Sequence, residues 1–438
     1  MSKPETYAKR RRHVMELMGD GVAVLPTAPV AHRNGDVEYL FRPDSDFQYL
    51  TGFGEPEAVM VLAPGRAQGE YIVFCRERDA EKETWHGRRA GLEGAVASFQ
   101  ADDAFPIEDI DDILPGLLEN RPKVYCGMGR YPEFDSQLIQ WFNEVKAKKR
   151  SGISAPGELV DISHILHELR LIKSADEVRT MKQAARVSAA AHCRAMRACQ
   201  PGMTEYQIEA ELEYEFRRGG AHSPAYPSIV AGGANACILH YTENQDDLRD
   251  GDLLLIDAGA EIDCYAADIT RTFPVNGRYS GEQRAVYEIV LEAQAAAIAE
   301  VRPGHHWNQP HEAAVRRLTE GLTDIGLLNG AVDESIENNS YQRYYMHRTG
   351  HWLGMDVHDV GDYRLGDQWR LLETGMVLTV EPGLYIPAAE DVETRWHNIG
   401  IRIEDDVLVT RKGREILTGD VPKEPAEVEA LMAEGMPG

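Results

Sequence analysis

The chain has few basic residues for its length and a large excess of acidic ones. Its 438 residues include 46 lysines and arginines against 72 aspartates and glutamates, which gives a formal net charge of −26. Because no basic patch could dominate such a field, this composition argues against binding to nucleic acid or to an anionic lipid surface. An excess of acidic residues is most often found on a solvated protein surface. A more specific interpretation is that some of these acids are gathered around bound cations.

The sequence also has no long apolar run and no clustered cysteines. No stretch approaches the roughly 18 apolar residues that a membrane-spanning helix needs, and the charged start at Met1 runs into no apolar signal region. The six cysteines form no Cys-x-x-Cys pair and no zinc-ligand spacing. We therefore expect free thiols in a reducing cytosol, a cytoplasmic location and no membrane partner.

The length suggests two or three domains, and the pattern of the chain changes near Arg170. Before that point, expected strands alternate with expected helices, which predicts an α/β unit with a mixed sheet. The strands are 22–25, 58–62 and 71–75, and the helices are 109–118 and 136–145. After it, Ser174-Ala-Asp-Glu177 is a capping box that opens a helix. We place the boundary at residues 168–173, with domains at 1–172 and 173–438.

The second part of the chain contains a weak internal repeat. A long helix that ends at Pro201-Gly202 is followed by a helix from Thr204, then by glycine-rich turns and strands. The same order recurs in helices at 280–301 and 309–322, separated by Pro303-Gly304. This order indicates a duplicated half-domain.

Two aspartates lie at the ends of apolar strands. Leu253–Asp257 is an apolar run that ends in a carboxylate, and Asp268 opens an expected returning strand eleven residues later. So short a connection favours antiparallel pairing, which would bring the two aspartates together. Two buried carboxylates at that distance repel each other, so either one is protonated or a metal ion lies between them.

Three further segments place polar groups beside apolar strands. The run that begins at Val377 ends in Glu381 before a Pro-Gly turn, and residues 399–404 alternate strictly, with Arg402 and Glu404 on the face opposite the isoleucines. A glycine-punctuated segment at 346–354 carries His351.

Together these segments supply four carboxylates and one imidazole: Asp257, Asp268, His351, Glu381 and Glu404. Four negative charges match two divalent cations, and an oxygen-rich set suits Mn²⁺ or Mg²⁺, with Co²⁺ or Zn²⁺ as alternatives. Two such metals about 3.5–4 Å apart are a standard arrangement for hydrolysis.

The order of these residues resembles the dinuclear-metal "pita-bread" peptidases, which include methionine aminopeptidase, prolidase and aminopeptidase P. The segments that carry the resemblance are HYTEN, LLLIDAGAE, YAADITRTFPVNG, GHWLGMDVHDVG, GMVLTVEPGLYI and GIRIEDDVLV. Near the N-terminus, YLFRPDSDFQYLTGF and TWHGRR look like the aminopeptidase P N-terminal domain. The resemblance implies an α+β protein of two domains. These are an α/β N-terminal domain at 1–172 and a pita-bread catalytic domain at 173–438.

The resemblance implies an enzyme that removes the N-terminal residue from peptides with proline in second position. In that family the five residues hold two metal ions, commonly manganese, and a bridging hydroxide attacks the scissile carbonyl. By the match, Glu381 also accepts the proton, His358 stabilises the oxyanion and His240 holds the substrate around the proline. The remaining pocket residues would be His347, Tyr385 and Arg402.

The resemblance also bears on assembly. Trp85 matches a tryptophan that reaches a neighbouring subunit's active site in tetrameric bacterial members, so it implies a homo-oligomer, either a dimer or a tetramer. One departure is Arg348-Thr349-Gly350, where many relatives carry Gly-Leu-Ser or Gly-Leu-Gly. We expect this large, charged arginine to alter the length or charge preference at the pocket rim.

Several alternatives stay open from the sequence. Prolidase shares all five ligands but cleaves only dipeptides that end in proline, and some prolidases also hydrolyse organophosphates; the N-terminal segments favour aminopeptidase P. A non-catalytic peptide-binding or histone-binding relative would lack ligands that this chain keeps. A metal-independent, creatinase-like amidinohydrolase would likewise lack the complete set.

Overall fold

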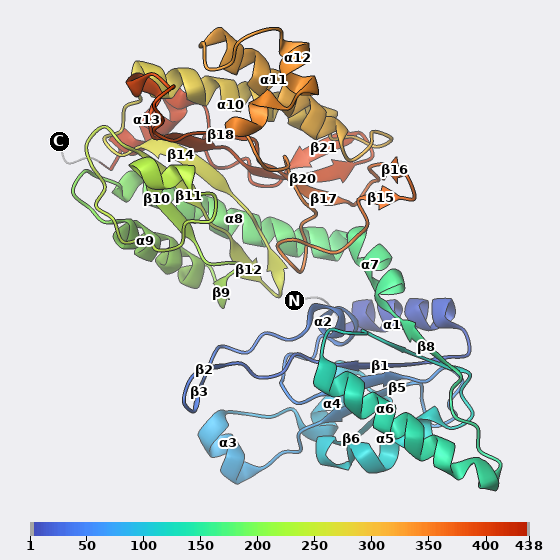
Figure 1. Cartoon of the computed structure of the whole chain (residues 1–438). Helices are drawn as coiled ribbons and strands as arrows, with labels where there is room; N and C mark the ends of the chain where they lie inside the picture. Colours follow the sequence, from blue (N-terminus) through green and yellow to red (C-terminus); the bar gives the residue numbers. More distant parts are fainter. Residues whose placement is uncertain (1–3, 436–438) are drawn as a thin grey trace. The chain divides into compact units, whose positions relative to one another are not determined.

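The computed structural model describes residues 4–435, which divide into two compact units, one up to Arg170 and one from Leu171 onward. The sequence-based boundary lies between residues 172 and 173. We call these parts the N-terminal unit and the C-terminal unit (Figure 1). Within residues 4–435, no helix combines the length and apolar character that a membrane crossing requires.

The N-terminal unit is built on a six-stranded sheet in the order β6-β5-β4-β1-β7-β8. Strand β1 pairs antiparallel with β4 and parallel with β7, which confirms the predicted mixed sheet. The strands are β1 (Val22–Pro26), β4 (Val59–Leu62), β5 (Tyr71–Cys75), β6 (Asp103–Pro106), β7 (Lys123–Cys126) and β8 (Glu158–Asp161), with a separate hairpin of β2 (His32–Asn34) and β3 (Val37–Glu38). The helices are α1 (Pro4–Met18), α2 (Ser45–Thr51), α3 (Ala80–His86), α4 (Gly91–Phe99), α5 (Ile110–Leu118), α6 (Pro132–Ala147) and α7 (Ser163–Leu171).

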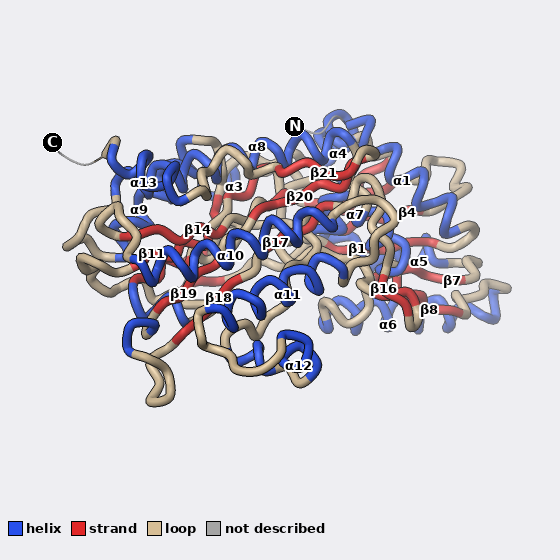
Figure 2. The backbone as a smooth tube through the Cα atoms, turned by 90° about the horizontal axis from the view of Figure 1, so that it is seen from above, coloured by secondary structure: helices blue, strands red, loops and turns tan. Residues whose placement is uncertain are grey.

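In the C-terminal unit, two helix pairs enclose several small antiparallel sheets. Helices α8 (Ala175–Ala198) and α9 (Glu205–Arg218) lie on one face, and α10 (Gly281–Glu300) and α11 (Gln309–Asp324) run side by side on the other (Figures 1 and 2). The first half contains β9 (Ser223–Pro224), β10 (Ile229–Gly232), β11 (Leu253–Asp257), β12 (Ala260–Ile262), β13 (Tyr265–Ala266) and β14 (Thr270–Pro274). The second contains α12 (Val332–Glu337), β15 (Arg364–Leu365), β16 (Gln368–Trp369), β17 (Val377–Val380), β18 (Gly383–Ile386), β19 (Ile399–Arg402), β20 (Asp405–Thr410), β21 (Gly413–Ile416) and α13 (Pro425–Ala433).

The order of elements follows the repeat expected from the sequence. In each half, two helices lead into a three-stranded antiparallel sheet, β10-β11-β14 in the first half and β17-β20-β21 in the second. The predicted capping box at the start of α8 is present: the Glu177 carboxylate accepts a hydrogen bond of 2.8 Å from the Ser174 backbone N–H.

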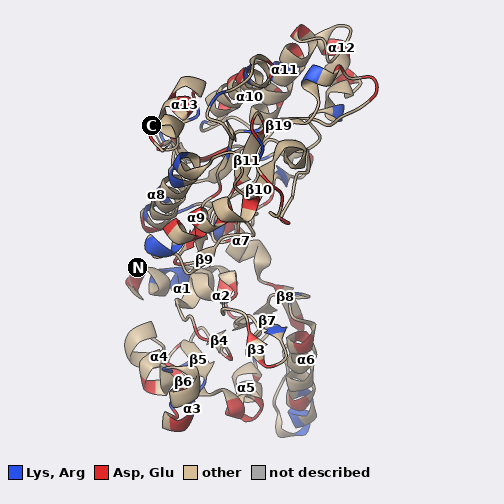
Figure 3. Cartoon of the chain, turned by 90° about the vertical axis from the view of Figure 1, so that its left-hand side faces the viewer, with Lys and Arg blue, Asp and Glu red and all other residues tan. Residues whose placement is uncertain are grey.

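The apolar residues form the core, and many of the acidic residues lie along helices (Figure 3). The alternating isoleucines Ile399, Ile401 and Ile403 are at most 5% exposed and join a core cluster with side chains of α10 and α11. Acidic residues lie along helices of both units, for example α6 and α9 (Figure 3). The buried carboxylates of the C-terminal unit are therefore exceptions that need their own explanation.

A buried ion pair ties helix α7 to helix α2 within the N-terminal unit. The guanidinium of Arg170, 1% exposed, donates a hydrogen bond of 2.7 Å to Asp46, and His167 lies 3.7 Å from the other carboxylate oxygen. Burial alone would raise the pKa of Asp46, but His167 and Arg170 outweigh it and lower that pKa to about 2.

This pair predicts a stability change that depends on pH. Because the folded pKa of Asp46 is depressed, its stabilising contribution is complete above pH 4 and is lost as the pH falls toward 2. Asp46→Asn should destabilise the N-terminal unit by about 2 kcal/mol at pH 7, and the difference should shrink between pH 4 and pH 2. Hydrogen exchange of peptides from β1 and β4, measured in urea, tests this. A difference that stays constant from pH 7 to pH 2 would contradict it.

Candidate metal centre

The first two predicted ligands lie at one end of a strand pair. Strands β11 and β14 are antiparallel, with Asp257 opposite Thr270, so Asp268 lies just before the returning strand. The strand begins at Thr270 rather than at the predicted Asp268 because β12 and β13 form a small hairpin in the connection. The turn into this hairpin requires a glycine: a Cβ on Gly259 would lie 1.7 Å from the carbonyl oxygen of Ala267.

The other three ligands come from the second half of the unit. Strand β17 ends at Val380, and the backbone N–H of Glu381 donates to Thr349 at 2.8 Å, which sets it beside the loop of His351. The backbone N–H of Glu404 donates to the Thr270 carbonyl at 3.0 Å, which joins it to the first half. Five residues from five segments therefore meet at one place.

The ligand atoms are close enough to share cations. Nitrogen and oxygen atoms of Asp268, His351 and Glu404 lie within 4.8 Å of one another. The Nε2 atom of His351 lies 3.4 Å from Asp268 Oδ2 and 3.7 Å from Glu381 Oε1. Its Nδ1 lies 2.9 Å from the backbone carbonyl of Trp352, so Nδ1 carries the proton that this contact needs and Nε2 faces the carboxylates.

The electrostatics of the cluster fit divalent cations. Burial raises the pKa of Glu381 to about 7, and burial together with Asp268 raises the pKa of Glu404 well above its usual range. The carboxylates overcome the burial of His351 and raise its pKa to about 9, which shows how strongly the site attracts positive charge. Among residues 4–435, the cations that pair with these four carboxylates are Arg402 and the histidines His347 and His351, so the donor set fits two divalent ions.

Hydroxyl groups complete the surroundings of the carboxylates. The Tyr226 hydroxyl contacts Oδ1 of both Asp257 and Asp268, and its distance to Asp257 is 2.6 Å. The hydroxyl thus holds these two oxygens close together. The Thr270 hydroxyl donates to Glu404 at 2.6 Å, and the Thr379 hydroxyl lies 3.4 Å from Glu381.

Sequence reasoning missed these hydroxyls and could have found two of them. Thr270 follows Asp268 by two residues and Thr379 precedes Glu381 by two, so alternation along an extended chain places each hydroxyl on the same side as a predicted ligand. The Thr270 hydroxyl reaches Glu404 across the site rather than Asp268. Tyr226 belongs to neither strand, and no spacing signal marks it.

A hydrogen-bond chain joins three of the predicted pocket residues to the cluster. Arg402, 4% exposed, donates to Asp257 at 2.6 Å and to the Tyr385 hydroxyl at 3.0 Å. That hydroxyl lies 2.9 Å from Nε2 of His347, to which it can donate its proton. Burial, followed by the charge of Arg402, lowers the pKa of His347 to about 4, so the ring is a neutral acceptor at neutral pH.

The remaining predicted residues differ in their surroundings. The rings of His358 and His351 meet edge to face, with centroids 4.4 Å apart. His240 is exposed, and it is among the groups that lower the pKa of both His347 and His358, so it lies in the same neighbourhood. Trp85 lies in the N-terminal unit, on α3, where it is 80% exposed.

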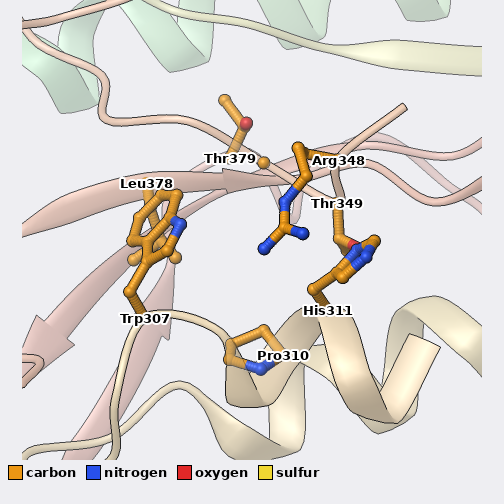
Figure 4. Close-up of a pocket in the computed structure, with 8 residues that line it drawn as sticks. Trp307, Pro310, His311, Arg348, Thr349, Leu378 and Thr379 are labelled. Carbon is orange, nitrogen blue, oxygen red and sulfur yellow. The ribbon is translucent and has the colours of Figure 1, made fainter. Parts of the chain in front are cut away.

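Arg348 lines a pocket whose lining includes none of His347, Tyr385 and Arg402, and its guanidinium points into the space between Trp307 and His311 (Figure 4). Its guanidinium contacts Asn308 and lies 5.5 Å from the ring centroid of Trp369. The residues that line the pocket are Trp307, Pro310, His311, Arg348, Thr349, Gly350, Leu378 and Thr379. The expected effect of Arg348 on substrate preference therefore remains a prediction.

Comparison with known families matches both units. Residues 179–411 match metallopeptidase family M24, and residues 7–125 match the aminopeptidase P N-terminal domain. The sequence is 46% identical to Xaa-Pro aminopeptidase of Haemophilus influenzae over 429 residues, which cover 98% of this chain and 97% of that protein.

Solved structures agree along the whole chain. Aminopeptidase PepP of Pseudomonas aeruginosa is 60% identical and superposes with a TM-score of 0.98, covering 99% of each chain. A zinc-substituted aminopeptidase P of Escherichia coli in complex with product is 43% identical, with a TM-score of 0.97 and complete coverage of both chains. The predicted two-domain α+β fold with a pita-bread second domain is confirmed.

The metal assignment can be tested by binding alone. Asp268→Asn replaces a charged ligand by a neutral amide, so the affinity for Mn²⁺ should fall by at least about 100-fold, as expected for a direct ligand. The matched control is Asp263→Asn in the same hairpin, where the backbone has a φ of 49° that asparagine adopts readily. Elemental analysis after dialysis measures the metal content. Full metal content in Asp268→Asn would show that the ligand assignment is wrong.

Proposed function

Because the chain belongs to metallopeptidase family M24 and, within it, to the Xaa-Pro aminopeptidases, we propose that it releases the N-terminal residue from peptides whose second residue is proline. The observation that carries this proposal is the cluster of four carboxylates and one imidazole, in which Asp268 and Glu404 are buried and the other three residues are partly buried. Its ligands would be Asp257, Asp268, His351, Glu381 and Glu404.

This set would hold two divalent ions. When bound, such ions lower the pKa of a water molecule and polarise the scissile carbonyl, so that hydrolysis proceeds at neutral pH. The chain's own groups then orient the peptide and handle its protons.

Glu381 is the proposed proton acceptor. Its Oε1 lies 3.7 Å from Nε2 of His351, and its Oε2 lies 3.8 Å from Nδ1 of His347, so the carboxylate is held between the metal ligands and the pocket. From this position it can take a proton from the attacking water and pass it to the proline nitrogen as the amide bond breaks.

His358 is the proposed oxyanion donor. Burial and the neighbouring His351 lower its pKa, so at neutral pH it is a neutral imidazole that offers one N–H. An N–H directed at the developing oxyanion stabilises it in a site from which water is largely excluded.

The pocket chain of His347, Tyr385 and Arg402, together with His240, would hold the proline. An Xaa-Pro amide has no N–H to donate, so recognition must use the shape of the ring and the carbonyl oxygen. The buried Tyr385 and the partly buried His347 present ring surfaces, with edges fixed by hydrogen bonds. This arrangement supports selection of a rigid, apolar second residue.

We extend the proposal to manganese as the metal, a cytoplasmic location and a dimeric or tetrameric assembly. Oxygen-rich ligation supports Mn²⁺, with Co²⁺ or Zn²⁺ as alternatives. All six cysteines are free, as expected for a reducing compartment. The exposed Trp85 supports a contact with a neighbouring subunit's active site.

A peptide series separates this activity from that of a prolidase. The chain should release arginine from Arg-Pro-Pro and cleave the dipeptide Gly-Pro at least about 100-fold less efficiently in kcat/KM, a difference of nearly 3 kcal/mol in transition-state binding. Chromatography of the products measures both reactions, with Arg-Ala-Ala as the control for proline in second position. Cleavage of Gly-Pro alone would favour prolidase.

Metal removal tests the mechanism. Exhaustive chelation should abolish hydrolysis of Arg-Pro-Pro, and Mn²⁺ should restore more activity than Co²⁺ or Zn²⁺ because the ligands are mostly carboxylates. In saturating Mn²⁺, Asp268→Asn should retain less than about 0.1% of wild-type kcat/KM, with an unchanged circular dichroism spectrum. Full activity in metal-free buffer would refute the dinuclear mechanism.

A further inference from the structure

Glu205 is a fully buried carboxylate outside the metal centre. It is the first residue of α9, it is 0% exposed, and within residues 4–435 no lysine, arginine or histidine forms an ion pair with it. A buried carboxylate without a cation is costly unless several donors satisfy it. The groups that donate hydrogen bonds to the Glu205 carboxylate therefore indicate its role.

Four hydrogen bonds converge on this carboxylate from both ends of one loop. The backbone N–H of Gly232 and the side-chain amide of Asn235 donate to Oε1 at 2.8 and 3.0 Å. The hydroxyl of Tyr241 and the backbone N–H of Asp246 donate to Oε2 at 2.7 and 2.9 Å. One side chain thus clamps residues 232–246 at both ends.

The clamped loop carries His240, which directly precedes Tyr241. The short helix η3 (Gly233–Cys237) at the start of the loop packs closely on strand β19: a Cβ on Gly400 would lie 2.2 Å from the Ala236 carbonyl oxygen. Strand β19 also carries Arg402, so the loop is fixed against the strand that supplies the pocket. Among residues 4–435, the exposed His240 side chain makes no hydrogen bond or ion pair.

We propose that Glu205 is a positioning residue for substrate binding, because its carboxylate holds the loop that presents His240 to the peptide. This inference rests on the proposed function, in which His240 contacts the substrate around the proline. It adds a residue that lies outside the pocket and touches neither the metal ligands nor the substrate.

The chemistry of the four donors makes the charge specific. Two of them are backbone N–H groups, which cannot become acceptors, whereas the Tyr241 hydroxyl can reverse its direction and the Asn235 amide can rotate to present its oxygen. In Glu205→Gln, the NH2 group of the glutamine would face the backbone N–H of Asp246 if it took the place of Oε2. If it took the place of Oε1, it would face the backbone N–H of Gly232. Either orientation leaves a partly buried backbone N–H without its acceptor and loosens one end of the loop.

The test is a double-mutant cycle with His240, using hydrolysis of Arg-Pro-Pro in saturating Mn²⁺. Glu205→Gln should raise KM about 10-fold, as expected for a lost buried hydrogen bond, while kcat stays within about 3-fold of wild type. His240→Ala should also raise KM, and adding Glu205→Gln to it should change KM by less than about 2-fold, because the loop then has no imidazole to position.

A second variant covers the case in which Glu205→Gln does not fold. Tyr241→Phe removes one donor and leaves the three N–H groups on the carboxylate, so it should raise KM about 3-fold, again only when His240 is present.

The matched control is Glu177→Gln. Glu177 is also a buried glutamate in the first turn of a helix, and it accepts a tyrosine hydroxyl (Tyr265, 2.9 Å) and a backbone N–H (Ser174, 2.8 Å). It should lower the thermal midpoint without changing KM.

The outcomes separate this proposal from the proposed function. If His240→Ala raises KM and Glu205→Gln raises it equally with and without His240, the positioning role is overturned while the proposed function stands. If wild type fails to hydrolyse Arg-Pro-Pro, or if His240→Ala leaves KM unchanged, the role of His240 fails and this proposal fails with it. A KM increase in Glu177→Gln equal to that in Glu205→Gln would also overturn it, because the effect would then be a general loss of stability.

Discussion

The metal centre depends on the cost of burying negative charge. Asp268 and Glu404 are at most 5% exposed, and Glu381 is buried enough for its pKa to rise to about 7. Each such carboxylate would lose several kcal/mol on leaving water without a partner. Strand ends that place four of these groups together are stable only with compensating positive charge, so the arrangement itself calls for cations.

A separate group of ion pairs fixes the backbone behind the ligands. Arg271, 0% exposed, donates to the backbone carbonyls of Thr270 and Glu404 at 3.0 and 2.5 Å, and to the carboxylate of Asp405 at 2.8 Å. Lys423 binds the other oxygen of Asp405 at 2.6 Å. Arg271 therefore holds the backbone of two ligand strands, and its charge is matched by Asp405. The site's own carboxylates remain available for metal.

The sequence predicts site residues where a charged side chain interrupts the apolar pattern of a strand. Asp257, Glu381 and Glu404 could be predicted as site residues because each breaks an apolar strand pattern at its end. Tyr226 and Glu205 could not, since their roles depend on contacts between segments 27 to 42 residues apart. The hairpin β12–β13, which moved the start of β14 to Thr270, was also missed, because its strands are only two or three residues long.

Assembly of the site requires both halves of the C-terminal unit. Asp257 and Asp268 belong to the first half, whereas His351, Glu381 and Glu404 belong to the second, and the bond from Glu404 N–H to the Thr270 carbonyl crosses between them. Neither half alone holds enough charge for two divalent ions. The ligand cluster lies where β14 of the first half packs beside β19 of the second. A cation bound there contacts both halves, so it stabilises their packing as well as the chemistry.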